Sequence, residues 1–281
     1  MPASSSRERR KEKRHQHFKH TGVMKKAKRS SNRQNKHKQY IENDTIEVQD
    51  KGRVVNPKFE RHRPVPLLPK TERQQDYMDS LLYNVITIAT GHAGSGKSYV
   101  ASYRAAELYC EGLIDKIFIT RPYAHLGTDY GATPGSDFEK LESFVRPMLD
   151  ALKKAMGEGK YNYCIDNGII EVAPLEKIQG RSFDEPCVLI CDEAQNASRA
   201  QLISLSTRIG SEIEYLAICG DPRQSIVKGY NALEYLTDFF ERNKIPNVGV
   251  VRFTEEDCVR SGIVKDILIA LEKEGGYYAD L

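Results

Sequence analysis

The glycine-rich stretch GHAGSGKS, residues 91–98, constrains the fold of this chain more than any other feature. It matches the pattern G-x-x-x-x-G-K-[ST]. An apolar, β-branched segment (85–89) precedes it, and a segment with apolar residues near helical spacing (98–110) follows it. Strand, glycine loop and helix in this order are typical of the phosphate-binding loop of nucleoside triphosphatases. A chance lysine after a glycine turn is the alternative, but it does not account for the flanking strand and helix.

The residue types in this loop suit a bound triphosphate. Glycines let backbone N–H groups surround a polyanion without Cβ clashes, and a helix N-terminus favours negative charge. Lys97 is expected to reach the β- and γ-phosphates, and the Ser98 hydroxyl to bind Mg²⁺. We expect nucleotide contacts along the whole loop, which comprises Gly91, His92, Ala93, Gly94, Ser95, Gly96, Lys97 and Ser98.

A second candidate element is the apolar segment 187–191, which ends in Asp192 and Glu193. Side chains at the carboxyl ends of strands in an α/β sheet face the ligand crevice. We assign Asp192 to Mg²⁺, directly or through water, and Glu193 to the activation of an attacking water as general base. A capping pair for the next helix is the alternative, which the phosphate-binding loop in the same chain disfavours. A water-activating glutamate also favours hydrolysis over a small-molecule kinase.

A third element repeats this arrangement, because the apolar segment 215–219 is followed by GDPRQ at 220–224. The neutral amide of Gln224 can hydrogen-bond the γ-phosphate or the attacking water. An ordinary turn rich in Asp, Pro and Arg is the alternative. The position of Gln224 after the Asp-Glu pair favours the first interpretation.

The remaining pattern predicts alternating strands and helices. Further strands are expected at 116–120 and 248–253, and a hairpin at 161–172 around Asp166–Gly168. Helices are expected at 74–83, 138–156, 198–209, 231–243 and 262–274. This order predicts an α/β fold with a mostly parallel sheet and helices on both faces.

Charge is distributed unevenly along the chain. Of 42 Lys and Arg, 14 lie in residues 1–38 beside only two acids, which leaves 28 basic and 37 acidic residues in the rest. We expect residues 1–40 to be a disordered basic arm, 41–70 a linker or short extension with a strand at 46–48, and 71–281 the catalytic domain. A basic arm beside an acidic domain favours nucleic acid as the partner, and the alternatives are a solubilising tail or a tail that binds acidic surfaces generally.

Composition also limits the compartment. The N-terminus has no hydrophobic signal region, and no apolar run approaches the roughly 20 residues of a membrane helix. The six cysteines are scattered without a CxxC pair, and Cys187, Cys191 and Cys219 lie in apolar segments, where buried free thiols are common. Metal binding by Cys187 and Cys191 is the alternative, but no set of partner ligands accompanies them. We therefore expect a cytoplasmic protein without membrane contact.

Taken together, these elements resemble the PhoH family of ATPases, relatives of superfamily 1 helicases. The resemblance covers about residues 67–275 and implies a RecA/helicase-like P-loop NTPase fold that binds and hydrolyses ATP. It rests on TERQQDY (71–77), GHAGSGKS (91–98), TRP (120–122), TPG (133–135) with Glu139–Lys140, QGR (179–181), CDEAQN (191–196), STRIG (206–210), CGDPRQ (219–224) and DCVR (257–260).

Some roles are implied by the resemblance alone. Gln74 matches the family glutamine that contacts adenine, which implies ATP over GTP, although the residue is otherwise only a polar helix start. Gln195 and Asn196 are expected to couple the phosphate site to nucleic acid, and a helix N-cap is the alternative for Asn196. The chain departs from the family at several positions, since it has His92 where proline is usual, serines at 95 and 98, no acid after Gln224, and Ser261 after Arg260.

The resemblance also raises the question of a transition-state arginine. Superfamily 1 helicases supply it from a second RecA-like domain, but about 210 core residues suffice for one such domain. The arginine must then come from the same domain or a neighbouring subunit, and Arg208, Arg252 and Arg260 are candidates, Arg260 being favoured by its motif. Surface ion pairs are the alternative for each. We expect a homo-oligomeric head-to-tail ring, such as a hexamer, and no PIN nuclease domain.

Two functions remain in view. The first is an ATPase stimulated by single-stranded nucleic acid, RNA favoured over DNA, with helicase-like action. The second is an RNA-binding module in which ATP controls assembly without translocation. Charge and motifs alone do not separate RNA from DNA or give a polarity of unwinding.

Overall fold

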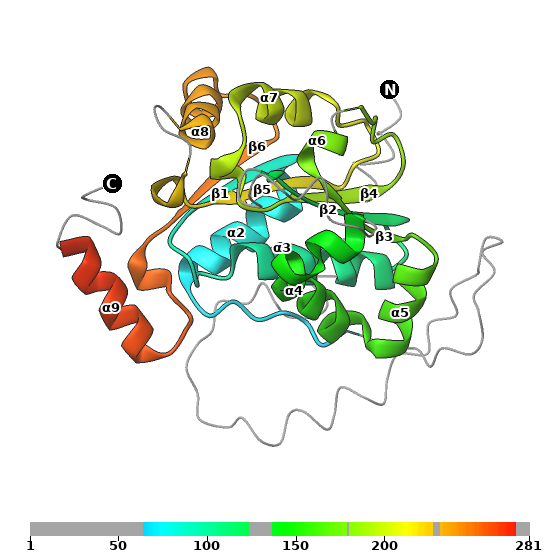
Figure 1. Ribbon diagram of the computed structural model, residues 1–281, viewed down its shortest axis with the longest axis horizontal. Helices are drawn as coiled ribbons and strands as arrows, with labels where there is room; N and C mark the ends of the chain where they lie inside the picture. The colour runs from blue at the N-terminus through cyan, green and yellow to red at the C-terminus, as the bar shows by residue number, and fades with distance from the viewer. Residues whose placement is uncertain (1–63, 124–136, 179, 227–230, 274–281) are drawn as a thin grey trace, which may run out of the picture. The chain divides into compact units, whose positions relative to one another are not determined.

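A six-stranded, all-parallel sheet forms the centre of the fold (Figure 1). The computed structural model describes residues 64–123, 137–178, 180–226 and 231–273. The strands are β1 (Ile86–Gly91), β2 (Lys116–Arg121), β3 (Ile170–Pro174), β4 (Cys187–Cys191), β5 (Tyr215–Gly220) and β6 (Val248–Phe253), in the order β3-β2-β4-β5-β1-β6. The predicted α/β class is confirmed, and the expected basic arm (1–40) and the strand at 46–48 lie outside the described residues.

Helices cover both faces of the sheet, as predicted. One face carries α2 (Glu72–Tyr83), α3 (Lys97–Cys110), α4 (Asp137–Met156) and α5 (Glu158–Asp166), and the other carries α6 (Leu175–Ile178), α7 (Arg199–Thr207) and α8 (Ala232–Asn243) (Figure 1). The last described element is α9 (Gly262–Lys273). In the part of the chain that the structure describes, short 3₁₀ turns follow β4, β5 and β6: η3 (Ala194–Asn196), η4 (Pro222–Gln224) and η5 (Glu255–Asp257).

Two apolar clusters, one on each face, hold the sheet between its helices. Tyr77, Phe253 and Leu108 belong to the cluster beneath α2–α5, and Phe118 and Phe183 to the cluster beneath α6–α8. β1, β4 and β5 are buried along their whole length, which explains why they read as continuous apolar runs. The strand ends that carry the motifs are thus fixed to a rigid core.

The predicted hairpin at 161–172 is wrong. Residues 158–166 form α5, and β3 then pairs in parallel with β2. Asn167 and Gly168 end the helix instead of turning a hairpin: the Gly168 N–H donates to Ile165 O (3.1 Å) and the Ile169 N–H to Cys164 O (2.8 Å). This is a Schellman arrangement, and it needs the same left-handed glycine (φ 64°) that a hairpin turn would use.

The sheet order places the three motif-bearing strand ends side by side. β5 lies between β1 and β4, so its end separates the phosphate-binding loop from Asp192 and Glu193. Because all strands are parallel, these three ends meet at one edge of the sheet. Within the described ranges, no helix combines the length and hydrophobicity that crossing a bilayer requires.

Candidate functional site

The phosphate-binding loop follows β1 and closes around its own lysine. The Lys97 ammonium donates to Gly91 O (2.6 Å), His92 O (2.8 Å) and Ser95 Oγ (3.1 Å). These three acceptors match the three donors of an ammonium. Burial lowers the pKa of Lys97, and the carboxylates of Asp221 and Asp192 oppose this shift. A triphosphate would supply stronger anionic acceptors for the same donors.

The loop backbone has the conformation that its glycines predict. Gly94 and Gly96 both have φ 83°, a left-handed value that other residues adopt only with strain. Gln74 of α2 contacts the loop, because its Nε2 donates to Ser95 O (2.8 Å). Its Oε1 accepts from the N–H of Lys70, which precedes α2 (2.9 Å). Both ends of this amide are therefore paired with backbone, and Gln74 does not line the cavity described below.

Asp192 follows β4 and faces the start of α3. Its Oδ1 accepts a hydrogen bond from Ser98 Oγ, and its backbone N–H donates to Thr120 O (2.9 Å) at the end of β2. Burial raises the pKa of Asp192, as does the nearby charge of Glu193. A hydroxyl and a carboxylate in contact fit Mg²⁺, which takes few protein ligands and completes its shell with phosphate and water oxygens.

Glu193 occupies a left-handed backbone conformation (φ 51°), which is uncommon for a residue other than glycine. Its Oε2 accepts a hydrogen bond from Gln195 Nε2, and its Oε1 lies 3.9 Å from Arg121 Nη2. Strain of this kind persists where the surrounding structure holds it. The carboxylate lines the same cavity as Lys97, where a general base would have to be.

The end of β5 joins the two sides of the site. The Asp221 N–H donates to Gln195 Oε1 (3.1 Å), and Gln224 Nε2 donates to Asp221 Oδ2 (3.2 Å). The buried Gln195 side chain therefore links Glu193 to the backbone of Asp221, the residue directly after β5. Asn196 accepts from the Ile226 N–H (3.2 Å), so it ties this segment to the same region.

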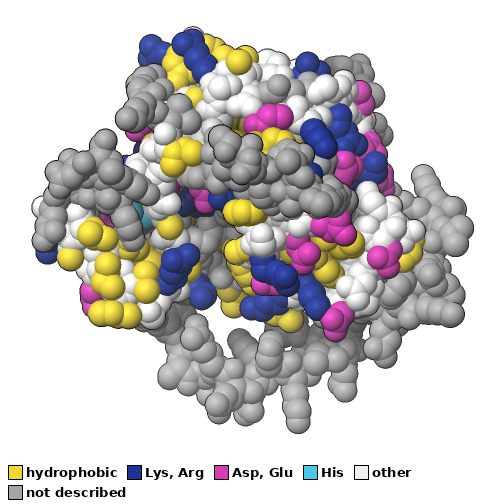
Figure 2. Space-filling view, in the orientation of Figure 1, with side chains coloured by type: hydrophobic (Ala, Val, Ile, Leu, Met, Phe, Trp, Pro, Cys, Tyr) yellow, Lys and Arg dark blue, Asp and Glu magenta, His cyan; other side chains and the backbone are white. Residues whose placement is uncertain are grey.

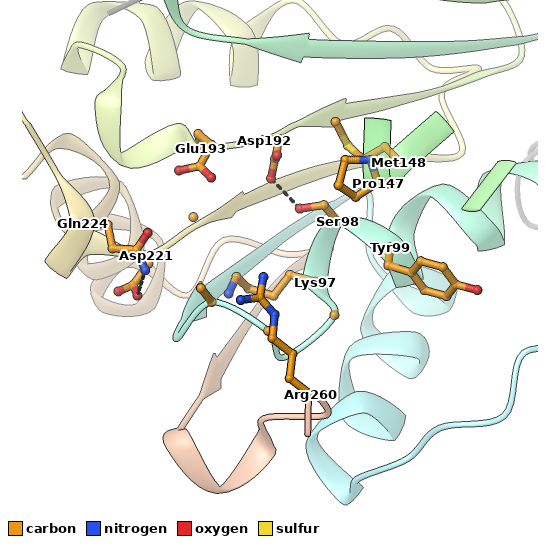
Figure 3. A pocket seen from close by; sticks show the side chains of 14 residues that line it. Lys97, Ser98, Tyr99, Pro147, Met148, Asp192, Glu193, Asp221, Gln224 and Arg260 are labelled. Atoms are coloured by element: carbon orange, nitrogen blue, oxygen red, sulfur yellow. Dashed lines mark hydrogen bonds between the residues drawn. The ribbon is translucent and has the colours of Figure 1, made fainter. Parts of the chain in front are cut away.

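These side chains surround one cavity of about 230 Å³ (Figure 3). The residues that line it are Ala93, Gly94, Gly96, Lys97, Ser98, Tyr99, Pro147, Met148, Asp192, Glu193, Gly220, Asp221, Gln224 and Arg260. The structure thus brings together the loop, the Asp-Glu pair, Gln224 and Arg260. Sequence reasoning missed Asp221, which follows its strand as Asp192 does, and it also missed Tyr99, Pro147 and Met148, whose apolar spacing gave no functional signal.

Arg260 enters this cavity from its own chain. The Val259 N–H donates to Gly94 O (3.0 Å), and a Cβ atom on Gly94 would lie 3.0 Å from Arg260 Cδ. Figure 3 shows the guanidinium on the side of the cavity that holds the Lys97 side chain.

The other two candidate arginines lie elsewhere. Arg252 forms an ion pair with Glu241, and Arg208 Nε donates to Ser204 Oγ (3.0 Å). Neither residue lines the cavity.

All six cysteines are free thiols. Five of them are buried, and burial raises the pKa of Cys187 and of Cys219 to about 12. Among the described residues, no group of three or more His, Cys, Asp or Glu side chains forms a metal cluster.

A family model described as PhoH-like protein matches residues 66–272. The chain is 35% identical over 209 residues to "Protein PhoH" of Escherichia coli K12, an alignment that covers 73% of this chain and 58% of that protein. It is 33% identical over 207 residues to a "PhoH-like protein" of Bacillus subtilis (73% and 64%). This chain therefore spans about three fifths of the length of the curated relatives it matches.

Two solved structures are distantly similar. The large terminase of a thermophilic bacteriophage aligns with a TM-score of 0.44 at 15% identity, over 71% of this chain and 50% of that chain. The Pif1 helicase of Candida albicans aligns with a TM-score of 0.36 at 18% identity, over 73% and 44%.

Proposed function

The chain belongs to the PhoH-like family, and from this premise we propose that it is a Mg²⁺-dependent ATPase stimulated by single-stranded nucleic acid. One observation carries the proposal. Lys97, Ser98, Asp192, Glu193 and Gln224 come from three separate segments of the chain and line one cavity at the carboxyl edge of the sheet. This set contains a phosphate-binding cation, a metal-binding pair, a general base and an amide for the γ-phosphate.

The reaction would use these groups as follows. Lys97 leaves its loop oxygens and binds the β- and γ-phosphates, and the loop N–H groups bind the remaining phosphate oxygens. Ser98 and Asp192 would hold Mg²⁺, which neutralises charge on the phosphates when it is bound. Glu193 accepts the proton of the attacking water, and Gln224 orients that water or the γ-phosphate. Gln74 supports the loop, and the family resemblance implies that it also contacts adenine, for which its amide would have to leave Ser95 O or the Lys70 N–H.

Arg260 supplies positive charge to the γ-phosphate from the same chain. Its contact with Gly94 supports an action in cis, so the ring is not required to complete the site. Replacing Arg260 with alanine should lower kcat by about 10²- to 10³-fold, the usual effect of losing one transition-state charge contact.

A mixing experiment measures where Arg260 acts. Equal amounts of Arg260→Ala and Lys97→Ala proteins are combined, and the ATPase rate of the mixture is compared with that of each variant alone. Action in cis predicts no recovery, since every subunit lacks one group. Recovery toward about a quarter of the wild-type rate, the share of interfaces at which random mixing unites both groups, would show that neighbouring subunits share the site.

We also propose a homo-oligomer, such as a hexameric ring, in the cytoplasm. Apolar surface supports association: Ile263 and Ile267 of α9 are 66% and 49% exposed, and Figure 2 shows hydrophobic side chains gathered over this helix. Sedimentation with and without ATP tests the oligomer against the 31.9 kDa mass of one chain.

The basic arm is proposed to hold nucleic acid near the ATPase domain. Deleting residues 1–40 should weaken binding to single-stranded RNA and flatten the dependence of log Kd on log salt, because fewer phosphates are neutralised. Fluorescence anisotropy between about 50 and 200 mM salt measures both effects. An unchanged slope would remove the arm from the binding surface.

The proposed function is tested by steady-state ATP hydrolysis with and without single-stranded RNA and DNA. Stimulation by RNA that Lys97→Ala abolishes, together with loss of strand displacement in the same variant, supports a nucleic-acid-coupled motor with helicase-like action. Hydrolysis that neither nucleic acid changes would favour the ATP-gated assembly module. Strand displacement that survives Lys97→Ala would contradict the motor.

A further inference from the structure

An arginine beside the general base has no role in the chemistry described above. Arg121 is the last residue of β2, and β2 pairs in parallel with β4, with Thr120 opposite Cys191. The Asp192 N–H also donates to Thr120 O (2.9 Å). This register continues past the strand ends, so Arg121 lies beside the Asp-Glu pair rather than on the open surface.

Three contacts orient the Arg121 guanidinium. Nη1 donates to Phe144 O on α4 (3.2 Å), and the guanidinium carbon lies 5.6 Å from the centre of the Phe144 ring. Nη2 lies 3.9 Å from Glu193 Oε1. The side chain is only 13% exposed. The guanidinium group of Arg121 is therefore fixed between α4 on one side and the carboxylate of Glu193 on the other.

One donor of Arg121 is not explained by a purely stabilising role. Its Nε is buried and has no hydrogen-bond partner among the residues that the structure describes. An unpaired buried donor is destabilising, and a loose ion pair at 3.9 Å offsets little of this cost. A buried donor left unpaired in a native structure needs an explanation, and a role in catalysis is one such explanation.

Glu193 needs support from more than one side. Its backbone is left-handed (φ 51°), and its side chain is half-buried at the cavity wall. Gln195 Nε2 binds one carboxylate oxygen, and without a second contact the carboxylate remains free to rotate about that bond. Arg121 approaches the other oxygen. Two contacts fix the plane of the carboxylate while leaving lone pairs for a water.

We infer that Arg121 is a positioning residue: together with Gln195 it fixes the carboxylate of Glu193 for the attack of water. The inference rests on the proposed ATPase function. Arg121 acts through Glu193 and does not line the nucleotide cavity. Its loss should therefore lower the rate of the chemical step and leave nucleotide binding unchanged.

The test uses two substitutions of Arg121 and one matched control. Arg121→Met keeps an unbranched chain against Phe144 without charge, and Arg121→Lys keeps the charge without the fork. Arg146→Met removes an exposed arginine of α4 that pairs along its own helix with Glu142, at 3.2 Å. For each protein, kcat and KM for ATP and the Kd of a fluorescent ATP analogue are measured.

Arg121→Met should lower kcat at least tenfold with a Kd within twofold of wild type. Arg121→Lys should recover part of the lost kcat. Arg146→Met should change neither kcat nor Kd. An unchanged kcat for Arg121→Met, or a loss of nucleotide binding as large as the loss of rate, would overturn the inference. A wild-type protein that binds the analogue but does not hydrolyse ATP would instead refute the proposed function.

A double-mutant cycle tests whether Arg121 acts through Glu193. In a Glu193→Gln background, Arg121→Met should cause no further loss of single-turnover rate, because the group that it positions is already gone. A second tenfold loss in that background would show that Arg121 acts on the phosphates directly, against the inference.

Discussion

Replacing Glu193 with glutamine should lower kcat for ATP hydrolysis by about 10²- to 10⁴-fold, the range of a lost general base. The amide has the shape of the carboxylate and keeps an oxygen for the hydrogen bond from Gln195. It cannot take a proton from water. Nucleotide binding depends on Lys97 and the loop, so the Kd for ATP should stay within about twofold.

A second glutamate provides the matched control for this substitution. Glu185 precedes β4, at the opposite end of the strand that leads to Glu193, and pairs with Lys116 at 3.4 Å. Glu185→Gln should leave both kcat and Kd unchanged. If Glu193→Gln weakened ATP binding as much as it slowed turnover, Glu193 would serve the ground state, as a metal ligand does, and would not be the general base.

The motifs could be predicted because each is local. The loop and the Asp-Glu pair each follow an apolar run directly, Gln224 lies four residues after the end of β5, and the parallel sheet brings such strand ends together. The hairpin prediction was wrong because it also used only local sequence. Asn167–Gly168 suits a hairpin turn and a helix end equally, and only the pairing of β3 with β2 decides between them.

Other parts of the site depend on long-range packing. β5 lies between β1 and β4, and no local pattern encodes that order. Arg260 was selected from its motif, but its place in the cavity of its own chain depends on a backbone hydrogen bond from Val259 to Gly94, far apart in sequence. Pro147 and Met148 line the cavity from α4, yet they read as ordinary helix residues.

Gly91→Ala should abolish ATP binding and lower the free energy of unfolding by at least about 3 kcal/mol, because overpacking and left-handed strain act together. Gly91 has φ 122°, and a Cβ atom there would lie 2.0 Å from the carbonyl oxygen of Phe253. That oxygen belongs to the backbone of β6, the neighbouring strand, so no side-chain rotation relieves the clash. The two strands must separate at their ends.

Separation of β1 from β6 would disturb the nucleotide site in two ways. The Gly91 carbonyl is an acceptor of the Lys97 ammonium (2.6 Å), so moving it displaces the lysine. The segment after Phe253 carries the Val259–Gly94 hydrogen bond and Arg260, so moving β6 withdraws the arginine. Both binding and the chemical step should therefore be lost, unlike the effect of Glu193→Gln.

Gly168→Ala separates this effect from the general cost of replacing a left-handed glycine. Gly168 has φ 64°, and a Cβ atom there would meet nothing within 4 Å. The Gly168→Ala substitution should lower the free energy of unfolding by only about 1–2 kcal/mol and leave ATP binding intact. Thermal unfolding should show Gly91→Ala about 6–12 °C below wild type, with Gly168→Ala closer to it. Equal shifts for the two variants, with ATP still bound by Gly91→Ala, would mean that β6 yields to a side chain at this position without disturbing the loop.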